Sequence, residues 1–129
     1  DYKGKAQYAL ESLKKNDFVF VHIEAPDEAS HNGDVKMKIE SIEKVDREVL
    51  GTIMNDPLYA QNLRVLILPD HRTPVAKKTH TAEPVCFIMS GKDIPSQGPS
   101  SFCERTAERS GIFFSNGEEL MSRFVKNER

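Results

Sequence analysis

Three short groups of histidine and aspartate are the part of this sequence with the clearest chemical potential. Asp27 and His31 are four positions apart, Asp70 and His71 are adjacent, and His80 lies in a Thr-His-Thr triplet. Carboxylate oxygens and imidazole nitrogens together are the ligand set of a borderline divalent metal such as Zn²⁺ or Mn²⁺. These five side chains are therefore candidate metal ligands.

Each group also has an ordinary structural interpretation when it is taken alone. An aspartate between two elements often caps the next helix or fixes a turn, which would account for Asp27 or Asp70. An isolated histidine such as His80 is more often a hydrogen-bonded surface residue than a ligand. The metal interpretation depends on the joint occurrence of the three groups, each next to an apolar, strand-like run.

Other polar residues near these groups have less specific interpretations. His22 lies inside an apolar run, which predicts a hydrogen-bonded core histidine. Glu24 and Glu28 are candidate acceptors for the second N–H of a ligating imidazole. A helix cap or simple solvation explains either glutamate equally well.

Apolar patterning predicts the strands that would position the ligands. Phe18–Ile23 is apolar on both alternating faces, which is typical of a central parallel strand. Pro26 is expected to end this strand, so that Asp27 to His31 lie in the following loop. Val65–Leu68 is the second predicted strand and leads directly to Asp70-His71, and Val85–Met89 is the third.

Helical spacing predicts three helices around these strands. Residues 1–15 form an amphipathic pattern, and a long helix is expected from Val35 to Ile53. Ser115-Asn116-Gly117-Glu118 has the form of a capping box that opens a last helix. The stretch Ser90–Ser101, rich in Ser, Gly and Pro, is predicted to be a loop.

The resulting order of helices and strands describes part of an α/β sandwich. In such sheets the chemistry gathers at the carboxyl ends of parallel strands. No helix is predicted between Leu68 and Val85, which makes a parallel crossover less favourable. If the third strand runs antiparallel, its connecting loop brings His80 to the same end of the sheet.

The amino-acid composition indicates which binding partners and which cellular compartment to expect for this chain. The chain has 129 residues, of which 38% are hydrophobic and 29% charged, and its net charge is −2. This charge gives no electrostatic reason to expect nucleic acid or an anionic membrane as partner. The apolar runs are far shorter than a membrane span, and no signal peptide is recognised. Cys86 and Cys103 form neither a disulfide framework nor a zinc knuckle, so we expect free thiols in a reducing cytosol.

The order D-x-x-x-H, then D-H, then H resembles the metal-binding half of the alkaline phosphatase superfamily. Within it, the sequence is most similar to the archaeal-type branch of the cofactor-independent phosphoglycerate mutases. The resemblance is densest in DFVFVHIEAPDEASHNGD and the following KIESIEKVDREV, and continues through LPDHRTPVAKKTHTAEPVCFIMSG. It is loose from about Ile94 to Phe114. Arg72 stands where the family often has Gly or Ser.

The resemblance implies a fold and a pair of metal sites. Residues 1–129 would be a single domain, the C-terminal part of a catalytic domain in an alkaline-phosphatase-like three-layer sandwich with a mostly parallel sheet. Asp27, His31 and His80 would bind one metal, and Asp70 with His71 would supply half of the other site. The aspartate and the serine nucleophile that complete the family's second site match nothing here.

The resemblance also implies an activity. The intact enzyme would be an isomerase that interconverts 2- and 3-phosphoglycerate through a phosphoserine, with two divalent metals (Mn²⁺ or Zn²⁺) and without bisphosphoglycerate. It would act in glycolysis in the cytosol. Because the chain begins at Asp1 without a methionine, we expect it to be a portion of a longer polypeptide and to be inactive alone, its partner being the missing N-terminal part.

Two alternatives remain open at this stage. Relatives with the same ligand motif are other metal-dependent phosphotransferases or phosphohydrolases, including a mutase-like homoserine kinase. The chain could also be a non-catalytic metal-binding domain, in which case the absence of a nucleophile is part of its design.

Overall fold

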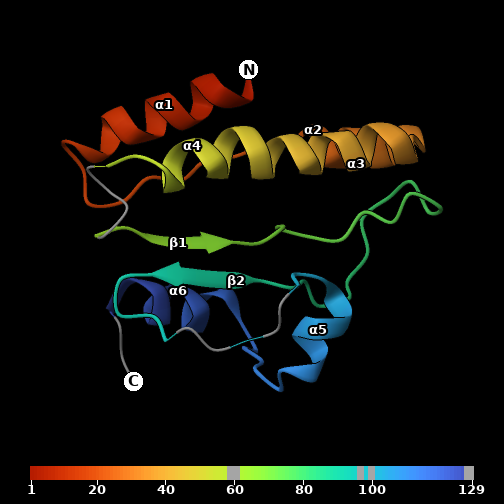
Figure 1. Cartoon of the computed structure of the whole chain (residues 1–129). Helices are drawn as coiled ribbons and strands as arrows, with labels where there is room; N and C mark the ends of the chain where they lie inside the picture. The colour runs from red at the N-terminus through yellow and green to blue at the C-terminus, as the bar shows by residue number, and fades with distance from the viewer. Residues whose placement is uncertain (58–61, 96–97, 99–100, 127–129) are drawn as a thin grey trace. The chain divides into compact units, whose positions relative to one another are not determined.

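The computed structural model describes residues 1–57, 62–95, 98 and 101–126 (Figure 1). The chain divides into two compact units. Unit 1 comprises Asp1–Ala60 and Thr73–Thr81, and unit 2 comprises Gln61–Arg72 and Ala82–Arg129. The single domain expected from the resemblance stays a prediction.

Unit 1 is helical. Its elements are α1 (Tyr2–Leu13), α2 (Ala25–Asn32), α3 (Val35–Lys44), the π-helical turn η1 (Val45–Leu50) and α4 (Gly51–Met54). Helix α1 packs against η1 and α4, and α2 packs against α3. The buried apolar side chains of this unit are Ala6, Ala9, Leu10, Ala29, Val49 and Ile53.

The predicted N-terminal helix is confirmed. Asp1 caps it, because the Asp1 carboxylate accepts a hydrogen bond from the Gly4 N–H at 2.8 Å. The helix ends at Leu13, and the Asn16 side chain donates to the Ser12 carbonyl at 3.0 Å just beyond its last turn.

The long helix predicted from Val35 to Ile53 is present as α3, η1 and α4 in succession. Asp34 caps it by accepting from the Met37 N–H at 2.8 Å. The apolar face is buried only toward the C-terminal end, at Val49 and Ile53, whereas Val35 and Ile39 at the other end are exposed.

The first predicted strand is wrong for the described part of the chain, in which Phe18–Ile23 belongs to no β-ladder. Its side chains alternate between partly buried Val19 and Val21 and exposed Phe18 and Phe20, the latter 75% exposed. A strand forms only where a second strand accepts its backbone hydrogen bonds. Apolar patterning alone does not supply that partner.

Unit 2 contains one antiparallel pair, β1 (Arg64–Ile67) and β2 (Ile88–Gly91), in which Arg64 pairs with Gly91 and Ile67 with Ile88. The second and third predicted strands are thus confirmed, although β2 begins three residues later than expected. The described fold is α/β with a small antiparallel sheet. The described residues contain no parallel strand pair, and the mostly parallel sheet and three-layer sandwich stay predictions.

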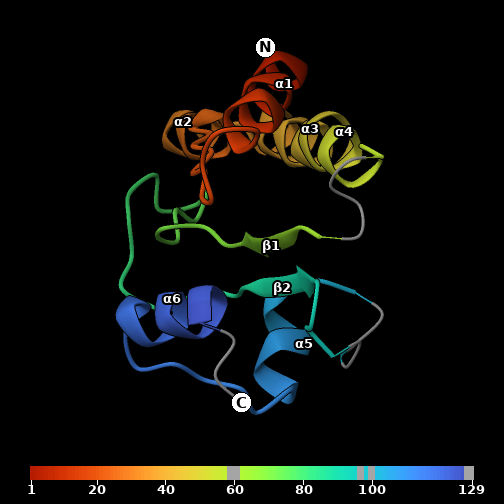
Figure 2. The ribbon, with the colours of Figure 1, turned by 90° about the vertical axis from the view of Figure 1, so that its left-hand side faces the viewer.

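Two helices follow β2, and Figure 2 shows both next to this strand. Helix α5 (Glu104–Arg109) was not predicted, whereas α6 (Gly117–Lys126) is the predicted last helix. Asn116 caps α6 by accepting from the Glu119 N–H at 2.9 Å. The predicted loop Ser90–Ser101 begins inside β2, and residues 96–97 and 99–100 lie outside the described part.

No helix in the described ranges combines the length and the apolar character needed to cross a bilayer.

Candidate metal centre

Helix α2 carries two of the predicted ligands on one face. Asp27 and His31 are related by one helical turn, so their side chains extend in the same direction. Pro26, which was expected to end a strand, instead occupies the first turn of this helix, where a missing N–H has no cost. Gly33 ends α2 in the left-handed conformation with φ +76°. The placement of Asp27 to His31 in a loop is therefore corrected to a helix.

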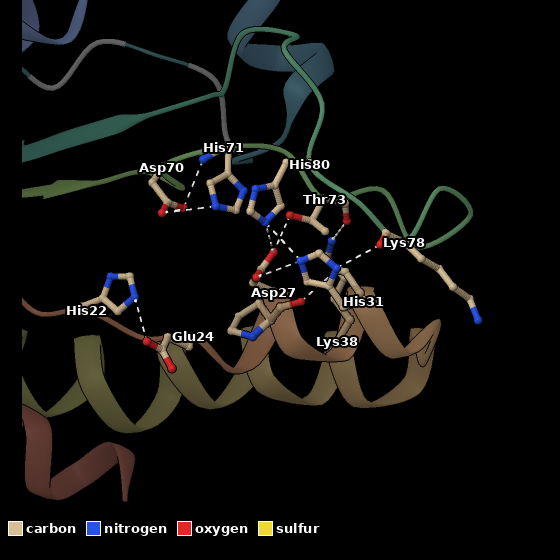
Figure 3. A network of polar contacts seen from close by, with 12 residues as sticks. His22, Glu24, Asp27, His31, Lys38, Asp70, His71, Thr73, Lys78 and His80 are labelled. Atoms are coloured by element: carbon tan, nitrogen blue, oxygen red, sulfur yellow. Dashed lines mark hydrogen bonds and ion pairs between the residues drawn. The ribbon is translucent and has the colours of Figure 1, made fainter.

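His80 reaches the same point from a distant part of unit 1. The Nε2 atoms of His31 and His80 are 3.1 Å apart, and the two rings are tilted with centroids 5.0 Å apart. His80 Nε2 is 3.6 Å from Oδ1 of Asp27, and His31 Nε2 is 3.3 Å from Oδ2 of the same carboxylate (Figure 3). Three of the five predicted ligands thus present their donor atoms to one point.

The separations between these atoms match those around a bound metal. Zn²⁺ binds imidazole nitrogen and carboxylate oxygen at about 2.0–2.2 Å, so neighbouring ligands of a tetrahedral site are about 3.3–3.6 Å apart. Octahedral coordination brings neighbouring ligands slightly closer. The observed separations are 3.1 Å between the two imidazole nitrogens, 3.3 Å from His31 to Oδ2 of Asp27 and 3.6 Å from His80 to Oδ1 of the same carboxylate. The donor set and its spacing therefore fit a divalent metal.

Polar groups from the segment after Arg72 surround these ligands. The Thr73 hydroxyl donates to Asp27 Oδ1 at 2.5 Å, and the Lys78 carbonyl lies 2.9 Å from His31 Nδ1. The Lys38 ammonium group donates to the Thr73 carbonyl at 2.9 Å. Sequence reasoning missed all three residues, because neither their type nor their spacing distinguishes them from ordinary polar residues.

The other two predicted ligands, Asp70 and His71, lie in unit 2 just after β1. The Asp70 carboxylate accepts from the His71 N–H at 3.1 Å, and its other oxygen is 3.4 Å from His71 Nε2. The Asp70 side chain is 68% exposed and that of His71 29%. This pair forms a local turn in which a carboxylate and an imidazole face each other.

His22 differs from the prediction of a core histidine. Its side chain is 51% exposed, and its Nε2 lies 3.6 Å from Oε1 of Glu24. The reason is the alternation along Phe18–Ile23, which places residue 22 on the exposed side with Phe18 and Phe20. Glu24 thus contacts His22, and the acceptor next to His31 is the Lys78 carbonyl.

Both cysteines are free thiols, as predicted, and are partly buried. The pKa of the Cys86 thiol is raised, and burial of the thiol is the largest cause. The Thr106 hydroxyl, 3.5 Å from the Cys103 sulfur, lowers the pKa of that thiol.

Comparison with known proteins agrees with the family resemblance of the sequence. The sequence profile of the Metalloenzyme superfamily matches residues 1–122. The chain is 40% identical over 122 residues to a probable 2,3-bisphosphoglycerate-independent phosphoglycerate mutase of Geobacter sulfurreducens. It is 40% identical over 121 residues to such a mutase of Methanothermobacter thermautotrophicus. Each alignment covers 94% of this chain.

A solved structure, that of the PH0037 protein from Pyrococcus horikoshii, aligns with a TM-score of 0.77 and 32% identity. The alignment covers 84% of this chain and 32% of that one. The chain likewise spans 31% of the length of the Geobacter protein and 30% of the Methanothermobacter protein. It thus corresponds to about a third of each relative.

Proposed function

Since the chain belongs to the Metalloenzyme superfamily, we propose that it is the metal-binding portion of a 2,3-bisphosphoglycerate-independent phosphoglycerate mutase. The observation that carries this proposal is the convergence of Asp27, His31 and His80 in a chain that matches such mutases over 94% of its length. The intact enzyme interconverts 2- and 3-phosphoglycerate in the cytosol. Manganese and zinc are the proposed metals, because both accept a mixed carboxylate and imidazole ligand set.

Asp27, His31 and His80 hold the first metal in this proposal. Asp27 supplies one negative charge against the two positive charges of the cation, and the two imidazoles supply neutral nitrogen ligands. A divalent metal at this position supplies electrostatic stabilisation of a charged phosphoryl group. The protein's own contribution is to hold the three ligands at the correct separation before the metal binds.

Asp70 and His71 provide half of the second metal site in this proposal. The support is covalent, because His71 precedes Thr73 by two residues and a chain spans at most about 3.3–3.6 Å per residue. The Cα atoms of His71 and Thr73 are therefore no more than about 7 Å apart. Thr73 in turn donates to Asp27. The assignment is therefore supported by the short stretch of sequence between the pair and a residue that contacts Asp27.

The nucleophile in this proposal is a serine contributed by the rest of a polypeptide of the relatives' length. Ser30 is unsuited to the role, because it is fully buried in α2 and its hydroxyl donates to the Pro26 carbonyl at 2.8 Å. Ser90 lies within β2. The phosphate passes from the substrate to the serine and returns to the other hydroxyl of the glycerate, so no bisphosphoglycerate is required.

The test is a mutase assay on a polypeptide of the relatives' length that contains this chain. Conversion of 3- to 2-phosphoglycerate should proceed with Mn²⁺ and without bisphosphoglycerate, and should stop when the metal is chelated. His31→Ala should lower kcat/KM by about 100-fold or more, since loss of a ligand exceeds the ~10–100-fold effect of losing a ligand's hydrogen-bonding partner. His22→Ala, which removes an exposed histidine of the same unit, should leave the rate unchanged.

Other outcomes would identify the rival functions. Release of inorganic phosphate without isomerisation would show a phosphohydrolase, and transfer to homoserine would show a kinase. Metal binding without turnover of any phosphorylated metabolite would favour a non-catalytic domain. Full mutase activity in His31→Ala would remove the proposed metal site from the reaction.

A further inference from the structure

The segment Thr73–Thr81 of unit 1 contributes more to the candidate metal centre than the ligand His80. Two of its polar groups contact the ligands on α2, and neither belongs to the predicted ligand set. We propose that the Thr73 hydroxyl and the Lys78 carbonyl are positioning groups that orient Asp27 and His31 before a metal binds. The inference rests on the proposed metal site and names the residues that prepare it.

Thr73 restrains the carboxylate of Asp27. The Thr73 side chain is nearly inaccessible to solvent, being 6% exposed, and its hydroxyl donates to Oδ1 of Asp27. A carboxylate rotates freely in water, and a hydrogen bond to one oxygen restricts that rotation. With Oδ1 held in this way, Oδ2 is directed at Nε2 of His31, 3.3 Å away. Thr73 therefore selects one orientation of the ligand.

Lys78 determines which nitrogen of His31 is available to a metal. Its carbonyl oxygen lies 2.9 Å from Nδ1 of His31, and a carbonyl can only accept a hydrogen bond. Nδ1 must then carry the proton, so the lone pair of a neutral imidazole is on Nε2. Nε2 is the atom that faces Asp27 and His80. The contact thus fixes the tautomer that a metal requires.

The backbone at Lys78 is adapted to this contact. Lys78 has φ +53°, in the left-handed region that non-glycine residues rarely occupy and that costs about 1–3 kcal/mol. Figure 3 shows the Lys78 side chain directed away from His31 while its carbonyl faces the ring. The strained conformation therefore serves the carbonyl and not the lysine side chain.

A third contact holds the segment in place. The ammonium group of Lys38, on α3, donates to the Thr73 carbonyl at 2.9 Å. The segment is thereby linked to α2 through Asp27 and His31 and to α3 through Lys38. Since α2 and α3 pack against each other, the candidate ligands and their positioning groups are held by the same pair of helices.

Calorimetric titration of Mn²⁺ into the 129-residue chain tests the role of Thr73. Thr73→Val keeps the shape and removes the hydroxyl, and should weaken Mn²⁺ binding by about 10–100-fold. Thr73→Ser retains the hydroxyl and should restore most of the affinity. Thr52→Val is the matched control, because the Thr52 hydroxyl donates to the Glu48 carbonyl within a helix away from the ligands. Its affinity should equal that of the wild type.

A second measurement needs neither a variant nor a metal. Long-range ¹H–¹⁵N correlation spectra of the metal-free chain report the tautomer of each neutral histidine. His31 should carry its proton on Nδ1. A His31 protonated mainly on Nε2 would overturn the role assigned to Lys78, even if Thr73→Val did not fold.

The outcomes separate this inference from the proposed function. No Mn²⁺ binding by the wild-type chain would contradict the metal site itself, and the positioning roles with it. Wild-type binding that is unchanged in Thr73→Val would overturn the inference and leave the metal site standing. Weakened binding in Thr73→Val with rescue in Thr73→Ser would support both.

Discussion

At the scale of single residues, the candidate centre depends on which atoms of each side chain face one another. His31 and His80 approach through their Nε2 atoms, and each lies within 3.6 Å of one oxygen of Asp27. Residue types and chain order were sufficient to select these three side chains, which the structure brings together, as candidate ligands. They were not sufficient to find Thr73 or Lys78. Thr73 acts through a hydroxyl 46 positions from Asp27 in the sequence, and the Lys78 carbonyl is presented by a left-handed backbone conformation, and spacing reveals neither.

The two thiols should differ in reactivity in a way that pH reveals. Burial raises the pKa of Cys86, and the Thr106 hydroxyl lowers that of Cys103. Because the thiolate is the nucleophile, Cys103 should be alkylated by iodoacetamide at a lower pH than Cys86. As the pH falls, Cys86 should lose its reactivity first. The measurement is the pH dependence of alkylation in Cys86→Ser and Cys103→Ser, each of which retains one thiol.

Thr106→Val in the Cys86→Ser background provides the control for this difference. Loss of the hydroxyl removes the largest cause of the lowered pKa of Cys103. The alkylation curve of Cys103 should therefore move to higher pH. Coincident curves for the two thiols in the otherwise unchanged chain would show that their surroundings do not differ as described.

At the scale of the elements, every predicted helix is present, although α2 and α5 were not predicted, whereas one of the three predicted strands is absent from the described residues. Helical periodicity depends on residues close in sequence, and the expected helices at the N-terminus, from Val35 to Ile53 and at Gly117–Lys126 are all present. Strand pairing depends on distant partners. Phe18–Ile23 has the composition of a strand but no ladder in the described chain, whereas Arg64–Ile67 finds its partner in Ile88–Gly91.

Arg64 links three parts of unit 2 and should contribute measurably to its stability. Its guanidinium group donates to the Lys92 carbonyl at 2.9 Å and to the Phe124 carbonyl at 3.0 Å, and lies 3.6 Å from the Asp93 carboxylate. The side chain is only 21% exposed. Arg64→Met keeps the aliphatic stem but removes the donors, and should lower the free energy of unfolding by about 1.5–3 kcal/mol.

Urea denaturation followed by circular dichroism measures this effect. Arg105→Met, at an exposed arginine of α5, is the matched control and should change the unfolding free energy by about 0.5 kcal/mol or less. If the two variants were equally stable, Arg64 would not join β1 to the turn after β2 and to α6.

At the scale of the whole molecule, the chain spans about a third of the length of its relatives and contains the proposed metal-binding residues. The superfamily was recognised by resemblance, from the order D-x-x-x-H, then D-H, then H along the chain. The mostly parallel sheet could not be inferred in the same way. A strand buried on both faces requires neighbours, and the described chain pairs only β1 with β2.

The proposed metal centre at Asp27, His31 and His80 is tested most directly by anomalous diffraction. Crystals of the 129-residue chain soaked in Mn²⁺ should show an anomalous difference peak about 2.0–2.2 Å from an Asp27 carboxylate oxygen and from Nε2 of both histidines. His31→Ala crystals soaked in the same way should lose the peak or show it strongly reduced, and His22→Ala crystals should retain it. A peak elsewhere in the chain, or none near these three side chains at saturating Mn²⁺, would contradict the proposed site.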